Sequence, residues 1–211
     1  SLNMDDIGYT VSTGYSRKNV DFSSQQITEI TCQGKGIFFL FPNARTIIDI
    51  GGQDSKAIKI DDKGNMIDFE MNDKCSAGTG RFLEVIANSL EVPLETMSSL
   101  SSKDYVPISS TCTVFAESEV VSRIAEGADR NSIIGGIHQS IASKILSLVG
   151  RVEIEPEVII TGGVAKNSAV VDAIAEKIGL NVKVPKQPQI TGALGAALIA
   201  IKKIEKLDSK L

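Results

Sequence analysis

The chain has 211 residues, of which 42% are hydrophobic and 23% are charged, and its formal net charge is −4. This balance is typical of a globular protein, and the lack of a basic stripe argues against a nucleic-acid partner. No apolar stretch reaches membrane-spanning length and the first residues do not resemble a signal peptide, so no membrane partner is expected. The chain has three cysteines, an odd and small number for its length, so we expect a cytoplasmic, reduced protein.

The first part of the chain is expected to contain a strand and a loop within 7–17. A helix is expected within 25–41 and should end near Gly34 or Gly36, because glycine is unfavourable inside helices. Three short segments then combine β-branched residues with turn residues between them. They predict an antiparallel meander with strands at 45–50, 55–61 and 66–71.

The rest of the chain alternates helical and strand patterns. Apolar residues at helical spacing predict helices at 80–92, 113–127, 132–152, 167–179 and 192–207. Asn167 is placed to cap one of them, and Gly127 and Gly179 are placed to end two. A buried strand is expected at 157–163 and a further strand at 181–184. This order of elements predicts an α/β fold.

Two strand ends carry glycine turns that suit a phosphate ligand. In "DIGGQDSK" (49–56), backbone N–H groups of the turn can face an anion, and Asp49 is placed to hold Mg²⁺. In "TGGVAKN" (161–167), paired glycines allow close approach of a flat ring before a helix start. The alternative is that both are plain tight turns that need glycine only for their backbone angles.

A third glycine turn, "CSAGTGRF" (75–82), precedes a helix start that favours an anion, and Cys75 lies at its mouth. Cys112 lies at the start of another predicted helix. A helix N-terminus stabilises a thiolate, so both cysteines are candidate metal ligands or nucleophiles. The alternatives are buried small side chains or a disulfide. Cys32 lies within a helical segment and is expected to be a buried filler.

The single histidine and one acidic pair receive no functional role. His138 is expected at a surface position of an amphipathic helix, which leaves histidine-based catalysis without a candidate. Glu117 and Glu119 are expected on a solvated helix face.

Five motifs in one order resemble those of a known family. They are "DIGGQDSK", "NDKCSAGTGRF", "SSTCTVFAESEV", "TGGVAKN" and "GALGAALIA". Together they closely resemble the activator ATPases of 2-hydroxyacyl-CoA dehydratases, which are related to the ATP-binding subunits of benzoyl-CoA reductase. The resemblance covers essentially the whole chain and is most specific around Cys75 and Cys112.

The resemblance implies an actin-like ATPase fold of the acetate/sugar kinase–Hsp70–actin class. The family opens with a phosphate loop of the form D-x-G-S/T-x-x-x-K, which has no match here, so we expect a chain truncated at the N-terminus. Residues 1–45 would be the remnant of a first lobe, completed by a C-terminal helix at 192–211. Residues 46–191 would form a second lobe with the cluster ligands and nucleotide loops.

The resemblance also implies a homodimer with one [4Fe–4S] cluster, because a cubane takes four thiolates and each chain offers Cys75 and Cys112. It implies ATP or ADP with Mg²⁺ as further cofactors, with Asp49 or Gln53 positioning the water for hydrolysis. The residues implied to bind the nucleotide are Thr13, Gly14, Gly51, Gly52, Gln53, Thr79, Gly80, Gly162, Gly163, Asn167 and Gln189.

The function that follows from the resemblance is ATP-driven, one-electron reduction that activates a dehydratase, with ferredoxin or flavodoxin as the electron donor. One alternative is electron donation to an aryl-CoA reductase or a double-cluster protein. Another is a small-molecule kinase of the same fold with inert cysteines. A nucleotide-dependent binding module is the alternative that is not an enzyme.

Overall fold

A mixed five-stranded sheet organises the chain, whose residues 6–109 and 112–209 are described by the computed structural model. The strand order is β5-β4-β3-β6-β7. The bounds are β3 Thr46–Ile50, β4 Ser55–Ile60, β5 Met66–Asn72, β6 Val158–Thr161 and β7 Val182–Lys183. The predicted meander of β3, β4 and β5 is confirmed as antiparallel, and β6 and β7 continue the sheet in parallel with β3.

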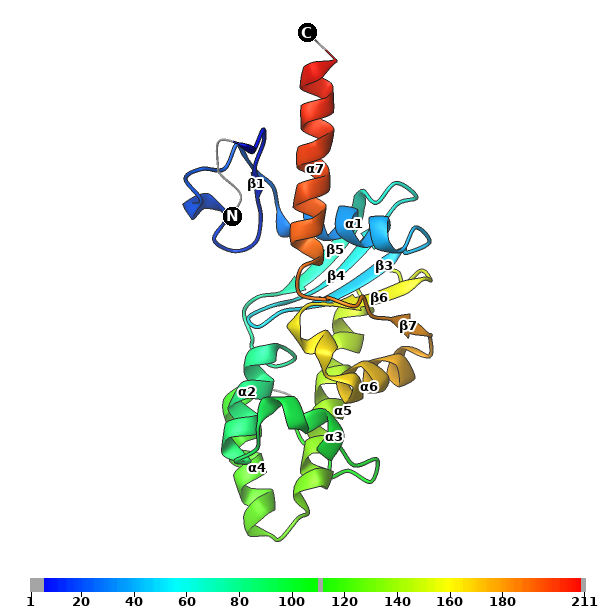
Figure 1. Cartoon of the computed structure of the whole chain (residues 1–211). Helices are drawn as coiled ribbons and strands as arrows, with labels where there is room; N and C mark the ends of the chain where they lie inside the picture. The colour runs from blue at the N-terminus through cyan, green and yellow to red at the C-terminus, as the bar shows by residue number, and fades with distance from the viewer. Residues whose placement is uncertain (1–5, 110–111, 210–211) are drawn as a thin grey trace.

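Helices cover both faces of this sheet (Figure 1). The longer ones are α1 Glu29–Leu40, α2 Gly80–Ser89, α4 Thr113–Ala125, α5 Arg130–Val149, α6 Ser168–Ile178 and α7 Thr191–Asp208. Short helical turns are η2 Arg17–Asn19, η3 Leu94–Thr96, α3 Met97–Leu100 and η4 Gly163–Lys166. The predicted helices are therefore present, with ends shifted by a few residues. Asn167 caps α6 through its side chain, and Gly179 ends that helix in the left-handed conformation.

Side chains of the central strand β3 point alternately to its two faces and so belong to two separate apolar clusters. Ile48 and Ile50 of β3 point into a large core with α2, α4, α5 and α6. Ile47, which precedes Ile48 in sequence, points to the opposite face and packs in a smaller cluster with Ile37 of α1. Successive side chains of a strand face opposite sides, so a fully buried strand separates two layers.

The prediction that the first helix ends near Gly34 or Gly36 is wrong, because α1 continues through both residues to Leu40. Glycine in α1 allows this helix to approach α7 closely. A Cβ at Gly36 would lie 2.0 Å from the Thr191 carbonyl oxygen, and one at Gly195 of α7 would lie 1.8 Å from the Cys32 carbonyl oxygen. The α1 and α7 backbones thus touch where neither carries a side chain.

The segment before α1 forms a small separate sheet. β1 Val11–Ser12 pairs in parallel with β2 Gln25–Gln26, as a shorter strand than the sequence indicates. The division into lobes at residues 45 and 46 stays a prediction. Residues 1–5, which carry part of the expectation about a signal peptide, lie outside the described residues.

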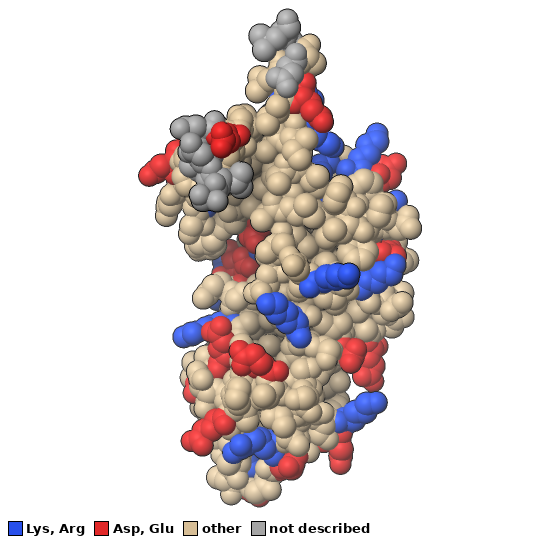
Figure 2. Space-filling model, in the orientation of Figure 1, with Lys and Arg blue, Asp and Glu red and all other residues tan. Residues whose placement is uncertain are grey.

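Charge is distributed in both signs over the face drawn in Figure 2, where Lys and Arg alternate with Asp and Glu. Within the part of the chain that the structure describes, no helix has the length and apolar character needed to cross a membrane.

Candidate functional site

The glycine turns after β3 and β6 lie against each other, because these strands are parallel neighbours and end at the same edge. A Cβ at Gly162 would lie 2.3 Å from the Ile50 carbonyl oxygen and 2.8 Å from Oδ1 of Asp49. Gly162 also has a φ of +88°, which favours glycine. The second turn therefore closes over Asp49 only because residue 162 has no side chain.

A cavity of about 410 Å³ opens beside these turns. Six of the residues predicted to bind nucleotide line it: Gly51, Gly52, Gly80, Gly163, Asn167 and Gln189. Sequence reasoning missed the remaining lining residues, which are Leu83, Glu84, Leu94, Glu95, Val164 and Lys166. The lining combines glycine backbone with apolar side chains and with the charged residues Glu84, Glu95 and Lys166. Glycine backbone suits an anionic group, and apolar side chains suit a flat ring.

The other predicted residues lie outside the lining of this cavity. Asp49 is buried beneath the two turns, and Gln53 is exposed at the first turn. Thr79 and Gly162 are buried behind the lining. Thr13 and Gly14 lie in the loop after β1, where Thr13 is close to Cys32 of α1.

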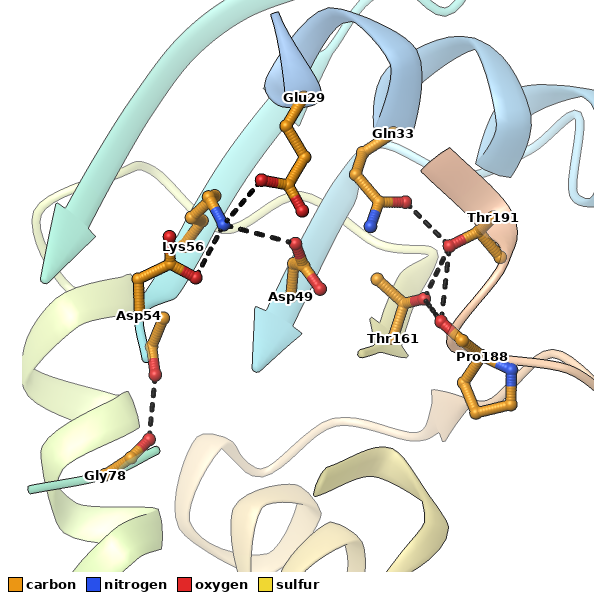
Figure 3. A network of polar contacts seen from close by, with 10 residues as sticks. Glu29, Gln33, Asp49, Asp54, Lys56, Gly78, Thr161, Pro188 and Thr191 are labelled. Carbon is orange, nitrogen blue, oxygen red and sulfur yellow. Dashed lines mark hydrogen bonds and ion pairs between the residues drawn. The ribbon is translucent and has the colours of Figure 1, made fainter. Parts of the chain in front are cut away.

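Asp49 belongs to a charged cluster that includes one buried lysine (Figure 3). Lys56 Nζ lies 2.7 Å from Asp54, 3.5 Å from Glu29 and 3.6 Å from Asp49. Burial raises the pKa of Asp49 to about 6, although Lys56 opposes this by lowering it. Burial alone would lower the pKa of Lys56, but the surrounding carboxylates raise it overall. The cluster carries more negative than positive charge, which suits an added cation.

A second polar network joins the strand edge to α1 and α7 (Figure 3). The Thr161 hydroxyl donates to the Pro188 carbonyl at 2.6 Å and lies 2.8 Å from the Thr191 hydroxyl. The Thr191 hydroxyl in turn donates to Gln33 Oε1 at 2.7 Å. These bonds fix the start of α7 and the loop that carries Gln189 against the sheet.

The start of α2 is bonded to the first glycine turn. The Gly80 N–H donates to the Gly51 carbonyl at 2.8 Å, and the Arg81 N–H donates to the Gly52 carbonyl at 2.9 Å. These two donors are therefore bonded to the turn, and the binding of an anion at this helix start stays a prediction. The two hydrogen bonds attach the start of α2 to the turn at 51–52.

Cys75 and Cys112 are free, half-buried thiols on neighbouring loops. Ser76 and Thr113, the residues that follow them, share a hydrogen bond of 2.9 Å between their hydroxyl groups. Cys112 is the N-cap residue of α4, as expected. Cys75 precedes α2, as predicted, since that helix starts at Gly80. Cys32 is fully buried in α1, and burial raises the pKa of its thiol.

Thr79 connects the cysteine loop to the cavity. Its hydroxyl and its N–H both donate to the Ser76 carbonyl, at 2.6 Å and 3.0 Å. The next residue, Gly80, bonds to Gly51 of the first turn. A continuous series of hydrogen bonds therefore runs from the cavity wall to the residue beside Cys75.

Two further expectations are wrong. His138 is not at a surface position: it is 1% exposed and bonded through both ring nitrogens. Glu117 and Glu119 are not simply solvated, because Glu117 accepts from the Ser89 hydroxyl and Glu119 accepts from the Ser109 N–H. The signal for His138 in the sequence was its place among apolar residues in "IIGGIHQSIA".

Comparison with known proteins places the chain in a family. The model of the BadF/BadG/BcrA/BcrD ATPase family matches residues 1–200. The activator of lactoyl-CoA dehydratase from Anaerotignum propionicum is 56% identical over 207 residues, which are 97% of this chain and 80% of the relative. One of the benzoyl-CoA reductase subunits from Thauera aromatica is 31% identical over 215 residues, covering 98% of this chain and 76% of the relative.

Solved structures agree with this. The activator of the 2-hydroxyisocaproyl-CoA dehydratase from Clostridium difficile, solved with bound ADPNP, superimposes with a TM-score of 0.95. It is 48% identical and covers 100% of this chain and 79% of its own. MreB 5 of Spiroplasma citri, at 17% identity and a TM-score of 0.56, covers 93% of this chain and 66% of its own and shows the same actin-like fold. The predicted fold class is therefore confirmed.

Proposed function

The chain belongs to the BadF/BadG/BcrA/BcrD ATPase family, and from this premise we propose that it is an ATP-dependent one-electron reductase that activates a 2-hydroxyacyl-CoA dehydratase. The observation that carries the proposal is the hydrogen-bonded connection between the cavity and two neighbouring free cysteines. An activator of this kind needs a nucleotide site, an electron carrier and a structural link between them.

Cys75 and Cys112 fit half of the ligand set of a [4Fe–4S] cluster. Both are free thiols, and the Ser76–Thr113 bond holds their loops side by side. Among the described residues, no group of three or more potential metal ligands occurs within one chain. A second copy related by a two-fold axis would bring four thiolates together. When bound, the cluster would accept and release one electron.

An exposed apolar face beside Cys112 supports the homodimer. Val114, Phe115, Val121 and Ile124 of α4 are all exposed. At helical spacing Val114, Val121 and Ile124 fall on one side of α4, and Phe115 is exposed in the first turn next to Cys112. Exposed large apolar side chains of this kind are typical of an interface. Because α4 begins directly after Cys112, contact through this face would place the two copies of Cys112 close to the axis.

The cavity is the proposed nucleotide site. Gly51 and Gly52 would approach the phosphates, and Leu83, Leu94 and Val164 would cover the adenine. Asp49 and Gln53 are proposed to position Mg²⁺ and the attacking water. The excess negative charge around Lys56 supports a cation there, and a relative of the same fold binds ADPNP.

Closure around ATP would be transmitted through α2. The first turn holds the start of this helix through two hydrogen bonds, and Thr79 holds the loop of Cys75. A movement of the turn must therefore displace a cluster ligand or break these bonds. We propose ferredoxin or flavodoxin as the electron donor and the iron–sulfur centre of the dehydratase as the acceptor.

The test is the iron content of the dimer after anaerobic purification. Cys75→Ser and Cys112→Ser should each remove the cluster, because either change removes two of its four ligands. Cys32→Ser is the matched control, because that thiol is buried in α1, and it should leave iron unchanged. Normal iron in either of the first two variants would disprove the bridging cluster.

An aryl-CoA reductase is the second candidate partner, because a component of benzoyl-CoA reductase is among the relatives. Reduction assays with each purified acceptor separate the two. Electron transfer to the dehydratase but not to the reductase is the result expected from the higher identity to dehydratase activators.

A further inference from the structure

The single histidine of the chain is buried in α5 between two polar partners. His138 Nδ1 lies 2.9 Å from the Ser101 hydroxyl, and Nε2 lies 3.1 Å from Nδ2 of Asn167. Nothing in the proposed reaction uses this ring. A buried ring with both nitrogens engaged and one partner in the nucleotide cavity requires its own explanation.

The network determines which ring nitrogen carries the proton. Asn167 caps α6, and its Oδ1 accepts from the Val170 N–H at 3.1 Å. This assigns the opposite side of the amide, Nδ2, to His138. An amide NH₂ can only donate, so Nε2 of the ring must accept. The proton therefore lies on Nδ1 and is donated to the Ser101 hydroxyl.

The ring has to stay neutral for this arrangement to exist, because a protonated imidazole has no acceptor. Burial lowers the pKa of His138 to about 4, so the ring is neutral at neutral pH. The imidazole is thus a permanent acceptor for Asn167 under ordinary conditions.

Asn167 is also the end of the turn that forms the cavity wall. Its N–H donates to the Val164 carbonyl at 2.9 Å, which closes η4. Gly163, Val164, Lys166 and Asn167 itself all line the cavity. The side chain of Asn167 is therefore held by α6 at Oδ1 and by His138 at Nδ2. Because Asn167 ends the η4 turn, its position determines the position of this wall of the cavity.

We infer that His138 is a positioning residue for nucleotide binding, which fixes Asn167 and through it the η4 wall of the cavity. The inference rests on the proposed function, since it takes this cavity as the nucleotide site. His138 touches no substrate, so its effect falls on affinity. Loss of the acceptor leaves the half-buried Nδ2 donor of Asn167 without its partner in the ring, and so removes one of the contacts that fix the cavity wall.

The test compares two substitutions of the ring and one of its other partner. His138→Leu keeps an apolar volume but removes the acceptor, and the Kd for ADP should rise about tenfold. His138→Gln offers an amide oxygen to Asn167 and should stay within about threefold of the parent protein. Ser101→Ala breaks the bond on the far side of the ring and should also stay within about threefold, even if it lowers the unfolding temperature.

Kinetics and spectroscopy provide readouts that a general loss of stability does not move. In ATP hydrolysis by His138→Leu, KM should rise about tenfold while kcat changes little, as expected for uniform binding. Because the chain has one histidine, its ring ¹⁵N signals are unambiguous. They should report the Nδ1–H form and shift when ADP is added.

The possible outcomes separate the inference from the proposed function. If the parent protein fails to bind ADP, both the proposed function and the inference about His138 are wrong. If it binds ADP and His138→Leu binds equally well, the inference alone is wrong. Equal weakening in His138→Leu and Ser101→Ala would also overturn it, because the role would then be stability of the fold.

Discussion

Two buried ionisable residues near the cavity have pKa values displaced in opposite senses. Burial raises the pKa of Asp49 and lowers that of His138, since in both cases it disfavours the charged form. Asp49 has a counter-charge in Lys56, whereas His138 has only uncharged hydrogen-bond partners in Ser101 and Asn167. The same physical cause therefore leaves one group ionisable near neutral pH and the other neutral.

His138→Gln should change the pH dependence of stability. The folded pKa is about 4 and the ordinary value is 6.5, so between them the unfolded state binds the proton more readily. The parent protein should lose up to about 3 kcal/mol of unfolding free energy as the pH falls through this window, and the variant should not. Urea titrations at a series of pH values measure this.

The comparison must be made as a difference between the two proteins. Asp49 contributes in the opposite sense, because its raised pKa makes it lose stability as the pH rises from 3.8 to about 6. That contribution is common to both proteins and cancels. Parallel curves for the parent and the variant would show that His138 titrates normally in the folded state.

At the level of elements, the contact between α1 and α7 depends on two glycines inside helices. Gly36 and Gly195 allow the two backbones to touch, at the cost of intrinsic helix propensity. The contact brings Gln33 of α1 to Thr191 of α7, and so links both helices to the strand edge. The unfavourable residue in each helix is therefore offset by a contact between helices.

Gly36→Ala and Gly195→Ala should each destabilise the fold by about 1–3 kcal/mol or more, because the new methyl group meets backbone that must shift. Gly192→Ala is the matched control in α7. Its Cβ would be 3.7 Å from Gln33, which is ordinary contact, so the change should be neutral or stabilising. Thermal unfolding of the three variants compares them. Equal changes in thermal stability at positions 192 and 195 would argue that helix propensity, and not contact between the helix backbones, determines the effect of the substitution.

At the level of the whole molecule, the loops of the two cysteines meet at the start of α4, the helix that carries four exposed large apolar side chains. Cys112 is the N-cap residue of α4, and the exposed Phe115 lies about one turn further along. The cavity is lined in part by Leu83 and Glu84 of α2, and α2 packs against α4. The proposed assembly therefore separates the nucleotide sites from the axis and connects them through these helices.

Phe115→Asp should convert the proposed dimer to monomer and remove iron in the same variant, because a single chain offers only two thiolates. Phe22→Asp is the control: Phe22 is 66% exposed and Phe115 is 68% exposed, so both changes add the same charge to a similar surface. Sedimentation and iron determination under anaerobic conditions measure the outcome. A monomer that retains full iron would exclude a cluster shared between two chains.

Local patterns in the sequence were sufficient to predict most elements of this fold. The meander of β3 to β5 follows from short alternating runs separated by turn residues, and α6 follows from Asn167 and Gly179 at its ends. These signals are local because capping and turn formation involve residues near each other in the chain. The end of α1 was mispredicted because the use of Gly36 depends on a helix far away in sequence.

The sequence by itself determined the α/β class, the family, and the motif residues Gly51, Gly52, Gly80, Gly163 and Asn167 that line the cavity. Only the tertiary structure decided that Leu94 and Val164 complete it, that α2 is bonded to the first turn, and that His138 is buried against Asn167. The physical reason is that glycine turns and caps are determined by neighbours in sequence. Burial and hydrogen bonding between α5 and α6 are determined by packing, which no local pattern records.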